Sequence, residues 1–333
     1  SPLPGERGAV RGCRQKDNLP GSSRHHPKGP HMPAELMNPA VIMGIRSLEL
    51  RAKLVVDGFR TGLNRSPRHG FSVEFSEYRQ YAQGDDPRFL DWKLFARSDR
   101  SYIRLFEDET NLRCYVVLDI SRSMSFGTPG WTKLEYAKTV AASLCWLLNR
   151  QGDAAGLTLF DDAVQSVVPA RYRPGQLRRL MVTLDAAQPG RQTRPAVALE
   201  DAAQRLRRRG LVVLISDLLA PIQEIGDGLR VLRGCRHDVV VLQVLDPAEK
   251  RLEFSGPHLF EDLETDQQVY ADPEQVREEY CSRLEAHNQL VRTECDAVGA
   301  AHRQLLTSEP LELVLSEFLE ARRRAQSWQR GAR

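Results

Sequence analysis

The chain has 333 residues, of which 41% are hydrophobic and 27% charged, with a formal net charge of +3. Residues 1–43 hold six Lys or Arg against three Asp or Glu, so the remainder is neutral, which argues against a surface built for a nucleic-acid backbone. Because no apolar run could span a bilayer and the six cysteines show no CxxC pair, we expect a cytoplasmic protein without a membrane span, disulfides or zinc.

The N-terminal segment, residues 1–43, is rich in Pro, Gly, Arg and His and shows no apolar periodicity. Such a composition cannot bury enough surface to offset the entropy cost of ordering, so we expect a disordered or artefactual extension. Residues 44–110 form a second segment. Within it, residues 45–56 have helical spacing, and residues 102–109 alternate as an edge strand feeding a central sheet would.

A buried strand is predicted at residues 114–118, which are apolar or aromatic and rich in β-branched side chains. Asp119, Ser121 and Ser123 follow at every second position. Ligands of open α/β sheets bind outside the carboxyl ends of the strands. One carboxylate and two hydroxyls suit a hard cation such as Mg²⁺. The alternative is a polar loop in which a serine caps the next helix.

Strands and helices alternate along the rest of the chain. Helices are predicted over residues 132–149, 175–187, 196–209, 222–233, 273–298 and 311–323. Strands are predicted over residues 155–160, 163–169, 211–215, 238–245 and 301–306, with a hairpin excursion in 251–271. The strand at 163–169 returns antiparallel after a tight turn. This alternation predicts an α/β fold with a doubly wound, mostly parallel sheet over residues 111–325, followed by a tail at 326–333.

Three loops at one end of that sheet offer oxygen ligands. They carry Asp119, Ser121 and Ser123 after the first buried strand, Thr193 before a helix, and Asp217 after the second buried strand. If the loops meet, we expect them to hold Mg²⁺, with Mn²⁺ or Ca²⁺ as alternatives.

This pattern resembles the metal-ion-dependent adhesion site of von Willebrand factor A domains. The shared features are DxSxS after the first strand, a Gly-x-x-Thr loop at 190–193, and Ser-Asp after a later strand, although the loop lacks the usual double glycine. The resemblance implies a Rossmann-like fold in which Ser121, Ser123 and Thr193 place hydroxyls on or near Mg²⁺. It further implies that Asp119 and Asp217 bind directly or through water, and that an acidic side chain of a partner protein completes the coordination.

The segment that precedes the DxSxS motif indicates a more specific family. Several uncommon residues in order between positions 65 and 97, including Gly84-Asp-Asp-Pro and Asp91-Trp, resemble the signature of bacterial domain-of-unknown-function family 58. Members are commonly encoded beside MoxR-type AAA+ ATPases, which implies a partner of that kind. Arg79, Arg88 and Arg97 in this segment either pair with acids inside the domain or dock a partner.

The resulting hypothesis is a Mg²⁺-dependent protein-binding module that acts with a MoxR-type AAA+ ATPase in assembly or maturation of a target protein. Met124 and Phe126 would border the contact. The first alternative is a metal-dependent phosphoesterase or nuclease at the same site. We name no catalytic residue, because the sequence has no GxSxG elbow, no GxxxxGK[ST] phosphate loop and no nearby base to activate water. The second alternative is a scaffold without metal.

Overall fold

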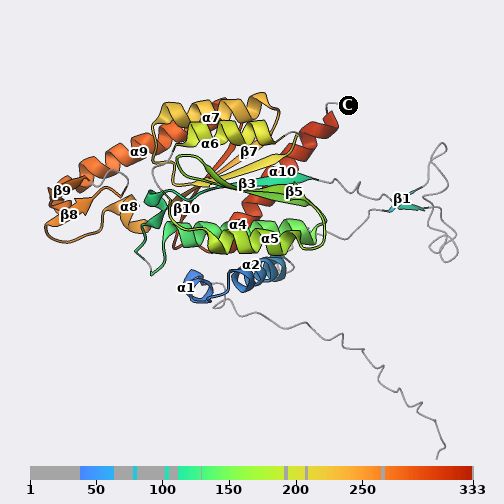
Figure 1. The fold of residues 1–333 in the computed structure, drawn as a ribbon, viewed down its shortest axis with the longest axis horizontal. Helices are drawn as coiled ribbons and strands as arrows, with labels where there is room; N and C mark the ends of the chain where they lie inside the picture. Colours follow the sequence, from blue (N-terminus) through green and yellow to red (C-terminus); the bar gives the residue numbers. More distant parts are fainter. Residues whose placement is uncertain are drawn as a thin grey trace, which may run out of the picture. The chain divides into compact units, whose positions relative to one another are not determined.

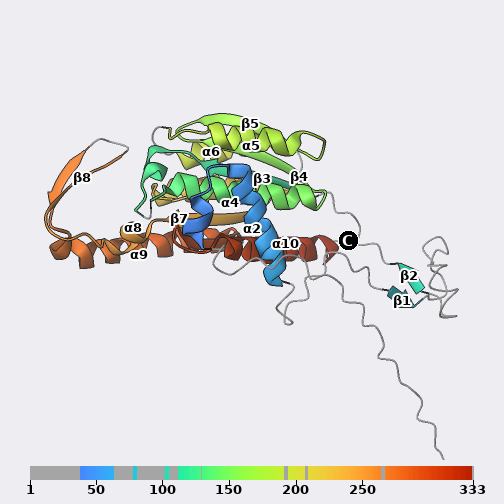
Figure 2. The same cartoon turned by 90° about the horizontal axis from the view of Figure 1, so that it is seen from below.

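The computed structural model describes residues 38–63, 78–80, 102–104, 112–128, 130–190, 194–206, 209–263 and 267–331. At the centre lies a six-stranded sheet with helices on both faces (Figure 1). Its strands are β3 (Arg113–Asp119), β4 (Ala154–Phe160), β5 (Val164–Arg171), β6 (Leu211–Ser216), β7 (Asp238–Leu245) and β10 (Ala301–Leu306). One face packs on α2 (Leu48–Leu63), α4 (Lys133–Arg150), α5 (Gln176–Ala186) and α10 (Leu311–Gly331), and the other on α6 (Pro195–Arg205), α7 (Ile222–Gly234) and α9 (Pro273–Ala297) (Figures 1 and 2).

The strand order across the sheet is β10-β7-β6-β3-β4-β5, which reads 6-5-4-1-2-3 when the six strands are counted along the chain. All neighbouring pairs are parallel except β4 and β5, which are antiparallel. This is the doubly wound order, and the direction of winding reverses between β3 and β6. The predicted fold class, including its single antiparallel strand, is confirmed.

The central strand β3 is buried on both faces, as its composition predicted. Cys114, Val116 and Leu118 pack into the core beneath α2, α4, α5 and α10. Tyr115 and Val117 point to the opposite face and pack with α6, α7 and α9. Because successive side chains of a strand alternate between faces, one apolar run serves two cores.

The N-terminal region differs from the sequence-based expectation in two places. The helix α1 (Pro39–Met43) is capped by the side chain of Asn38 and buries Ile42, although composition predicted disorder up to residue 43. The strand β2 (Tyr102–Arg104) pairs antiparallel with β1 (Tyr78–Gln80) in a separate two-stranded sheet, so the edge-strand prediction was wrong for these residues. Residues 105–109 of the predicted strand lie outside the described part of the chain. Alternation identifies a strand but not the strand that it pairs with.

The C-terminal part contains the predicted hairpin as β8 (His258–Glu261) and β9 (Gln268–Ala271). It is preceded by a short helix, α8 (Pro247–Arg251), which was not predicted. The last helix runs eight residues beyond its predicted end, to Gly331. Among the described residues, no helix has both the length and the apolarity needed to cross a membrane.

A close approach of two strands gives a first testable prediction. A Cβ added at Gly156 in β4 would lie 2.7 Å from the backbone nitrogen of Ala170 in β5. We expect Gly156→Ala to lower the free energy of unfolding by about 1–3 kcal/mol, because β5 must shift away. Urea denaturation measures this change. The control Gly234→Ala, where no atom lies within 4 Å of the new Cβ, should leave stability unchanged or slightly raised; equal losses in both variants would contradict the packing argument.

Candidate metal centre

Two of the predicted site residues, Asp119 and Asp217, lie where the winding direction of the sheet reverses. Asp119 is the last residue of β3, and Asp217 directly follows the last residue of β6. The two strands are parallel neighbours, with Leu118 opposite Ile215, so their carboxyl ends lie side by side. In a doubly wound sheet this reversal forms the crevice in which ligands bind.

Asp119 is fully buried, and its two oxygens accept hydrogen bonds from different loops. The backbone N–H of Ser121 donates to Oδ1 at 2.8 Å, and the hydroxyl of Ser216 donates to Oδ2 at 2.6 Å. Burial, reinforced by the charge of Asp217 and opposed by the hydrogen bonds from Ser216 and Ser121, raises the pKa of Asp119 to about 7. Two carboxylates therefore repel each other in a dry site, and a cation bound there would relieve the repulsion.

The two serines of the DxSxS motif bring their hydroxyls together. Their Oγ atoms lie 3.1 Å apart, on the turn formed by the 3₁₀ helix η3 (Arg122–Ser125). Ser121 makes no side-chain capping bond, and α4 is capped instead by Thr132, which forms a capping box with Glu135. The alternative in which a motif serine caps the next helix therefore does not describe this loop.

Thr193 lies outside the described residues. On either side of it, the N–H of Gly190 donates to the carbonyl of Ile120 at 2.6 Å, and the N–H of Arg194 donates to that of Asp161 at 3.1 Å. A Cβ on Gly190 would lie 2.1 Å from Oδ2 of Asp161, so a larger residue here would force the side chain of Asp161 to shift. The flanks of the third loop thus attach beside the ends of β3 and β4.

The residues expected to border a partner differ in how exposed their side chains are. Met124 is fully buried in the core, because the turn after β3 points it inward, so its side chain is not available for contact. Phe126 is half-buried and lines a groove next to the site. The side chain of Arg79 and the residues Arg88 and Arg97 lie outside the described part of the chain.

Sequence reasoning missed a charged side chain in the site. Lys133, the first residue of α4, is 0% exposed, and its Nζ donates to Oδ2 of Asp217 at 2.8 Å and to Oε1 of Glu249 at 2.6 Å. Burial alone would lower the pKa of Lys133, but the charges and hydrogen bonds of the two carboxylates outweigh it and raise the pKa. Lys133 therefore stays charged and joins α4, the loop after β6, and α8. A lysine at a helix N-terminus, which the helix dipole disfavours, was the signal that could have indicated an acidic partner.

A third acid at a strand end, Asp246 after β7, belongs to the framework of the site. Its Oδ1 accepts hydrogen bonds from the Thr128 hydroxyl at 2.5 Å and the Ala248 N–H at 2.9 Å. Its Oδ2 accepts from the Thr128 N–H at 3.0 Å and the Thr307 hydroxyl at 3.2 Å. With both oxygens engaged, Asp246 fixes the loop between η3 and α4.

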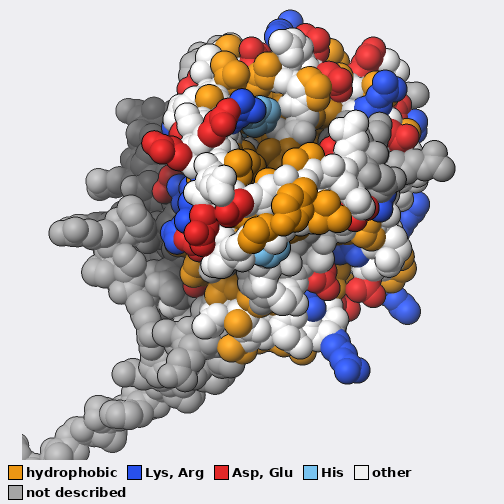
Figure 3. Space-filling model, turned by 90° about the vertical axis from the view of Figure 1, so that its left-hand side faces the viewer, with side chains coloured by type: hydrophobic (Ala, Val, Ile, Leu, Met, Phe, Trp, Pro, Cys, Tyr) orange, Lys and Arg blue, Asp and Glu red, His pale blue; other side chains and the backbone are white. Residues whose placement is uncertain are grey.

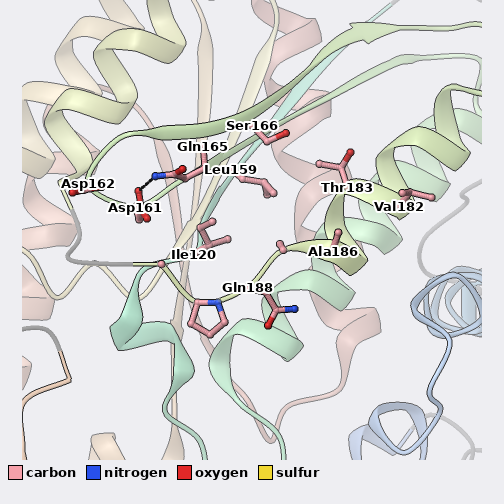
Figure 4. Close-up of a pocket in the computed structure, with 13 residues that line it drawn as sticks. Ile120, Leu159, Asp161, Asp162, Gln165, Ser166, Val182, Thr183, Ala186 and Gln188 are labelled. Atoms are coloured by element: carbon pink, nitrogen blue, oxygen red, sulfur yellow. Dashed lines mark hydrogen bonds between the residues drawn. The ribbon is translucent and has the colours of Figure 1, made fainter.

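A cavity of about 870 Å³ adjoins the site through Ile120, the residue after Asp119 (Figure 4). It lies between the β4–β5 turn and the end of α5, and its polar lining includes Asp161 and Asp162. Gln165 donates from Nε2 to Oδ1 of Asp161 at 2.6 Å and fixes that carboxylate. The cavity therefore places further carboxylates next to the loop that carries the DxSxS motif.

The carboxylates and hydroxyls at this site are the kinds of ligand that a hard divalent cation prefers. Two carboxylates and two hydroxyls come from two loops at one edge of the sheet, and oxygen donors of these kinds bind Mg²⁺. Within the described ranges, no three His, Cys, Asp or Glu side chains are grouped to hold a metal. A cation here would therefore depend on the hydroxyls of Ser121 and Ser123.

The fold and the site define an α/β protein with a doubly wound sheet that carries DxSxS and Ser-Asp where its winding reverses. A family model described as "Protein of unknown function DUF58" matches residues 77–290, and the chain belongs to this family. Uncharacterized proteins of Mycobacterium tuberculosis and Mycobacterium bovis are 30% identical to it over 297 residues, covering 87% of this chain and 92% of theirs.

Solved structures with a partly similar fold share less sequence identity with this chain. BatB from Bacteroides thetaiotaomicron aligns with a TM-score of 0.43 at 15% identity, covering 63% of this chain and 97% of that protein. The PilB minor pilin from Streptococcus sanguinis aligns with a TM-score of 0.42 at 11% identity, covering 68% of this chain and 65% of that one. Neither similarity transfers an activity or a ligand.

Proposed function

We propose that this protein is a Mg²⁺-dependent protein-binding module that captures an acidic side chain of a partner. Asp119 and Asp217 would hold the cation together with the hydroxyls of Ser121 and Ser123, and Thr193 remains the proposed further donor. The observation that supports this most is the 2.6 Å hydrogen bond from Ser216 to Asp119, which joins the two strand ends that carry the acids. When bound, Mg²⁺ would supply an electrophilic position for one more carboxylate.

The charges of the buried groups suit the capture of an anion. Asp119, Asp217 and Glu249 contribute three negative charges when ionised, and Lys133 contributes one positive charge. A divalent cation would bring the sum over these four groups to zero, and the carboxylate of Asp246 is engaged in its own hydrogen bonds to Thr128, Ala248 and Thr307. The negative charge that an incoming carboxylate meets would therefore be much reduced. Without Lys133 the loaded site would stay negative and repel the partner.

The proposed partner is a MoxR-type AAA+ ATPase, and the proposed role of the pair is assembly or maturation of a target protein. This part of the proposal is supported by membership of the DUF58 family, because members of that family are commonly encoded beside ATPases of this kind. The ATPase or the target protein would provide the acidic side chain.

An enzymatic alternative uses the same metal site. The cavity beside Ile120 would give a substrate room, but its carboxylates Asp161 and Asp162 would repel an anionic phosphoester unless a bound cation offset their charge. A metal-dependent hydrolase needs a base that activates water. Turnover of a generic phosphodiester that Asp217→Ala abolishes would favour a phosphoesterase or nuclease over a binding module.

Asp119→Ala tests the binding proposal. We expect Mg²⁺ to raise the unfolding temperature of the wild-type protein and not that of the variant, because ligand bound only to the native state stabilises it by about 2.7 kcal/mol at 100 times the Kd. In a pull-down, the co-produced AAA+ ATPase should be retained in Mg²⁺ and lost in EDTA or with the variant.

The matched control is Ser125→Ala, which lies on the same turn and whose hydroxyl donates to the Arg122 carbonyl. It should keep the response to Mg²⁺. Retention of the ATPase that neither EDTA nor Asp119→Ala alters would refute a metal-dependent contact.

A further inference from the structure

A groove of about 760 Å³ opens beside the metal site, between the η3 turn, α8, the start of α9 and the β8–β9 hairpin. Ser123 lines it at one end. Its apolar lining includes Phe126, Leu252, Phe254, Phe260, Val269 and Tyr280. Figure 3 views this end of the molecule, where hydrophobic side chains border a hollow and acidic side chains lie close by. A mostly apolar groove of this size is typical of a binding site.

Side chains from both faces of the hairpin line this groove: Phe260 and Val269 from one face, and Leu259 and Glu261 from the other. Phe260 in β8 lies opposite Val269 in β9, and side chains opposite each other share a face. The ring of Phe260 lies 5.9 Å from that of Phe254 at the base of the hairpin, measured between centroids. Val269 is nevertheless 61% exposed, so the aromatic cluster covers only part of the apolar face.

The other face of the hairpin is apolar as well. Leu259 lies opposite Tyr270, and these side chains are 60% and 73% exposed. A two-stranded hairpin is only marginally stable by itself, and apolar side chains gathered on an exposed surface mark contact sites. The hairpin therefore presents more apolar surface than the described residues cover.

The charge of this region selects the kind of partner. Residues 251–277 contain seven Asp or Glu and two Arg. Arg251 pairs with Glu253, and Arg277 donates to the backbone carbonyls of Leu252 and Phe254, so an excess of acidic side chains remains. Glu261 and Asp262 line the groove itself. A basic segment would be attracted to this rim and an acidic one repelled, and the effect would weaken with salt.

We propose that the groove and the β8–β9 hairpin bind a segment of a partner protein in which apolar side chains alternate with lysine or arginine. This contact requires no metal and is separate from the proposed capture of a carboxylate. Because Ser123 lines the groove, a partner that places a carboxylate at the metal site would have its neighbouring residues close to the groove.

The test uses two labelled peptides, (Leu-Lys)₄ and (Leu-Glu)₄, and the full-length protein in EDTA. Fluorescence anisotropy should show that (Leu-Lys)₄ binds at least tenfold more tightly than (Leu-Glu)₄. Val269→Glu should weaken binding of (Leu-Lys)₄ at least tenfold, although it adds a negative charge, because it puts a charged side chain on the apolar face. Glu261→Lys should weaken it as well, and more at low salt than at high salt.

The matched control is Val182→Glu, which adds the same charge on α5 at a side chain that is 60% exposed, against 61% for Val269. It should not weaken binding, and neither should Asp119→Ala, which separates this contact from the metal site. Equal binding of both peptides, or wild-type affinity in Val269→Glu, would overturn the proposal. Self-association of the wild type that Val269→Glu abolishes, without peptide binding, would assign the groove to a second copy of the chain and also overturn it.

Discussion

Replacing Lys133 with methionine is expected to lower the free energy of unfolding by about 3–5 kcal/mol, the usual cost of removing one partner from a buried ion pair. The variant leaves Asp217, which is 1% exposed, and Glu249, which is 16% exposed, without their cation. Methionine fills a similar volume, so the loss would come mainly from the uncompensated charges. Urea denaturation in EDTA, monitored by circular dichroism, gives the measurement.

A triple variant separates charge from packing. Lys133→Met combined with Asp217→Asn and Glu249→Gln removes all three charges and should recover at least half of the lost stability. Lys53→Met, on an exposed position of α2, is the control for the chemical change and should have little effect. If the triple variant were no more stable than Lys133→Met, the lysine would act through packing and the electrostatic explanation would fail.

A second large effect is expected at Phe318 in α10. Its side chain is 0% exposed and packs in the core that also contains α2 and α4. We expect Phe318→Ala to cost about 3–5 kcal/mol, the range for truncating a buried phenylalanine. Leu313→Ala on the same helix is the matched control, because Leu313 is 44% exposed and its loss should cost little. Thermal and urea unfolding would both report the difference.

The Phe318 variant also tests the size of the folding unit. The family model ends at residue 290, so β10 and α10 lie beyond it, and α1 and α2 lie before its start at residue 77. Their apolar faces nevertheless belong to the same core as β3. A Phe318→Ala variant as stable as Leu313→Ala would show that α10 adds nothing to that core.

Sequence alone predicted the doubly wound sheet and the position of Asp119 and Asp217, because both depend on local patterns. A buried apolar run ending in an acid identifies a strand and its carboxyl end, and the doubly wound order places two such ends together. The contacts of Lys133 depend instead on tertiary packing. Its second partner, Glu249, lies on α8, a helix of five residues whose apolar pattern is too short to recognise.

Other differences between the sequence-based predictions and the structure also arise from tertiary contacts. Met124 looked like a border residue because it adjoins the DxSxS motif, but the turn of η3 directs it into the core. The strand β2 was recognisable from alternation, whereas its pairing with β1 depends on a long-range contact that the pattern does not encode. Side-chain direction after a strand end and the choice of strand partner are set by the folded chain.

The packing of α2 with α10 also bears on how the protein is made. The helix α2 ends at Leu63, and the helix α10 that covers the same core begins at Leu311. At typical rates of translation the ribosome needs about 10–50 s to make the residues between them. During that time the apolar side of α2 lacks one of its final neighbours, so the nascent chain is expected to depend on chaperones until α10 emerges.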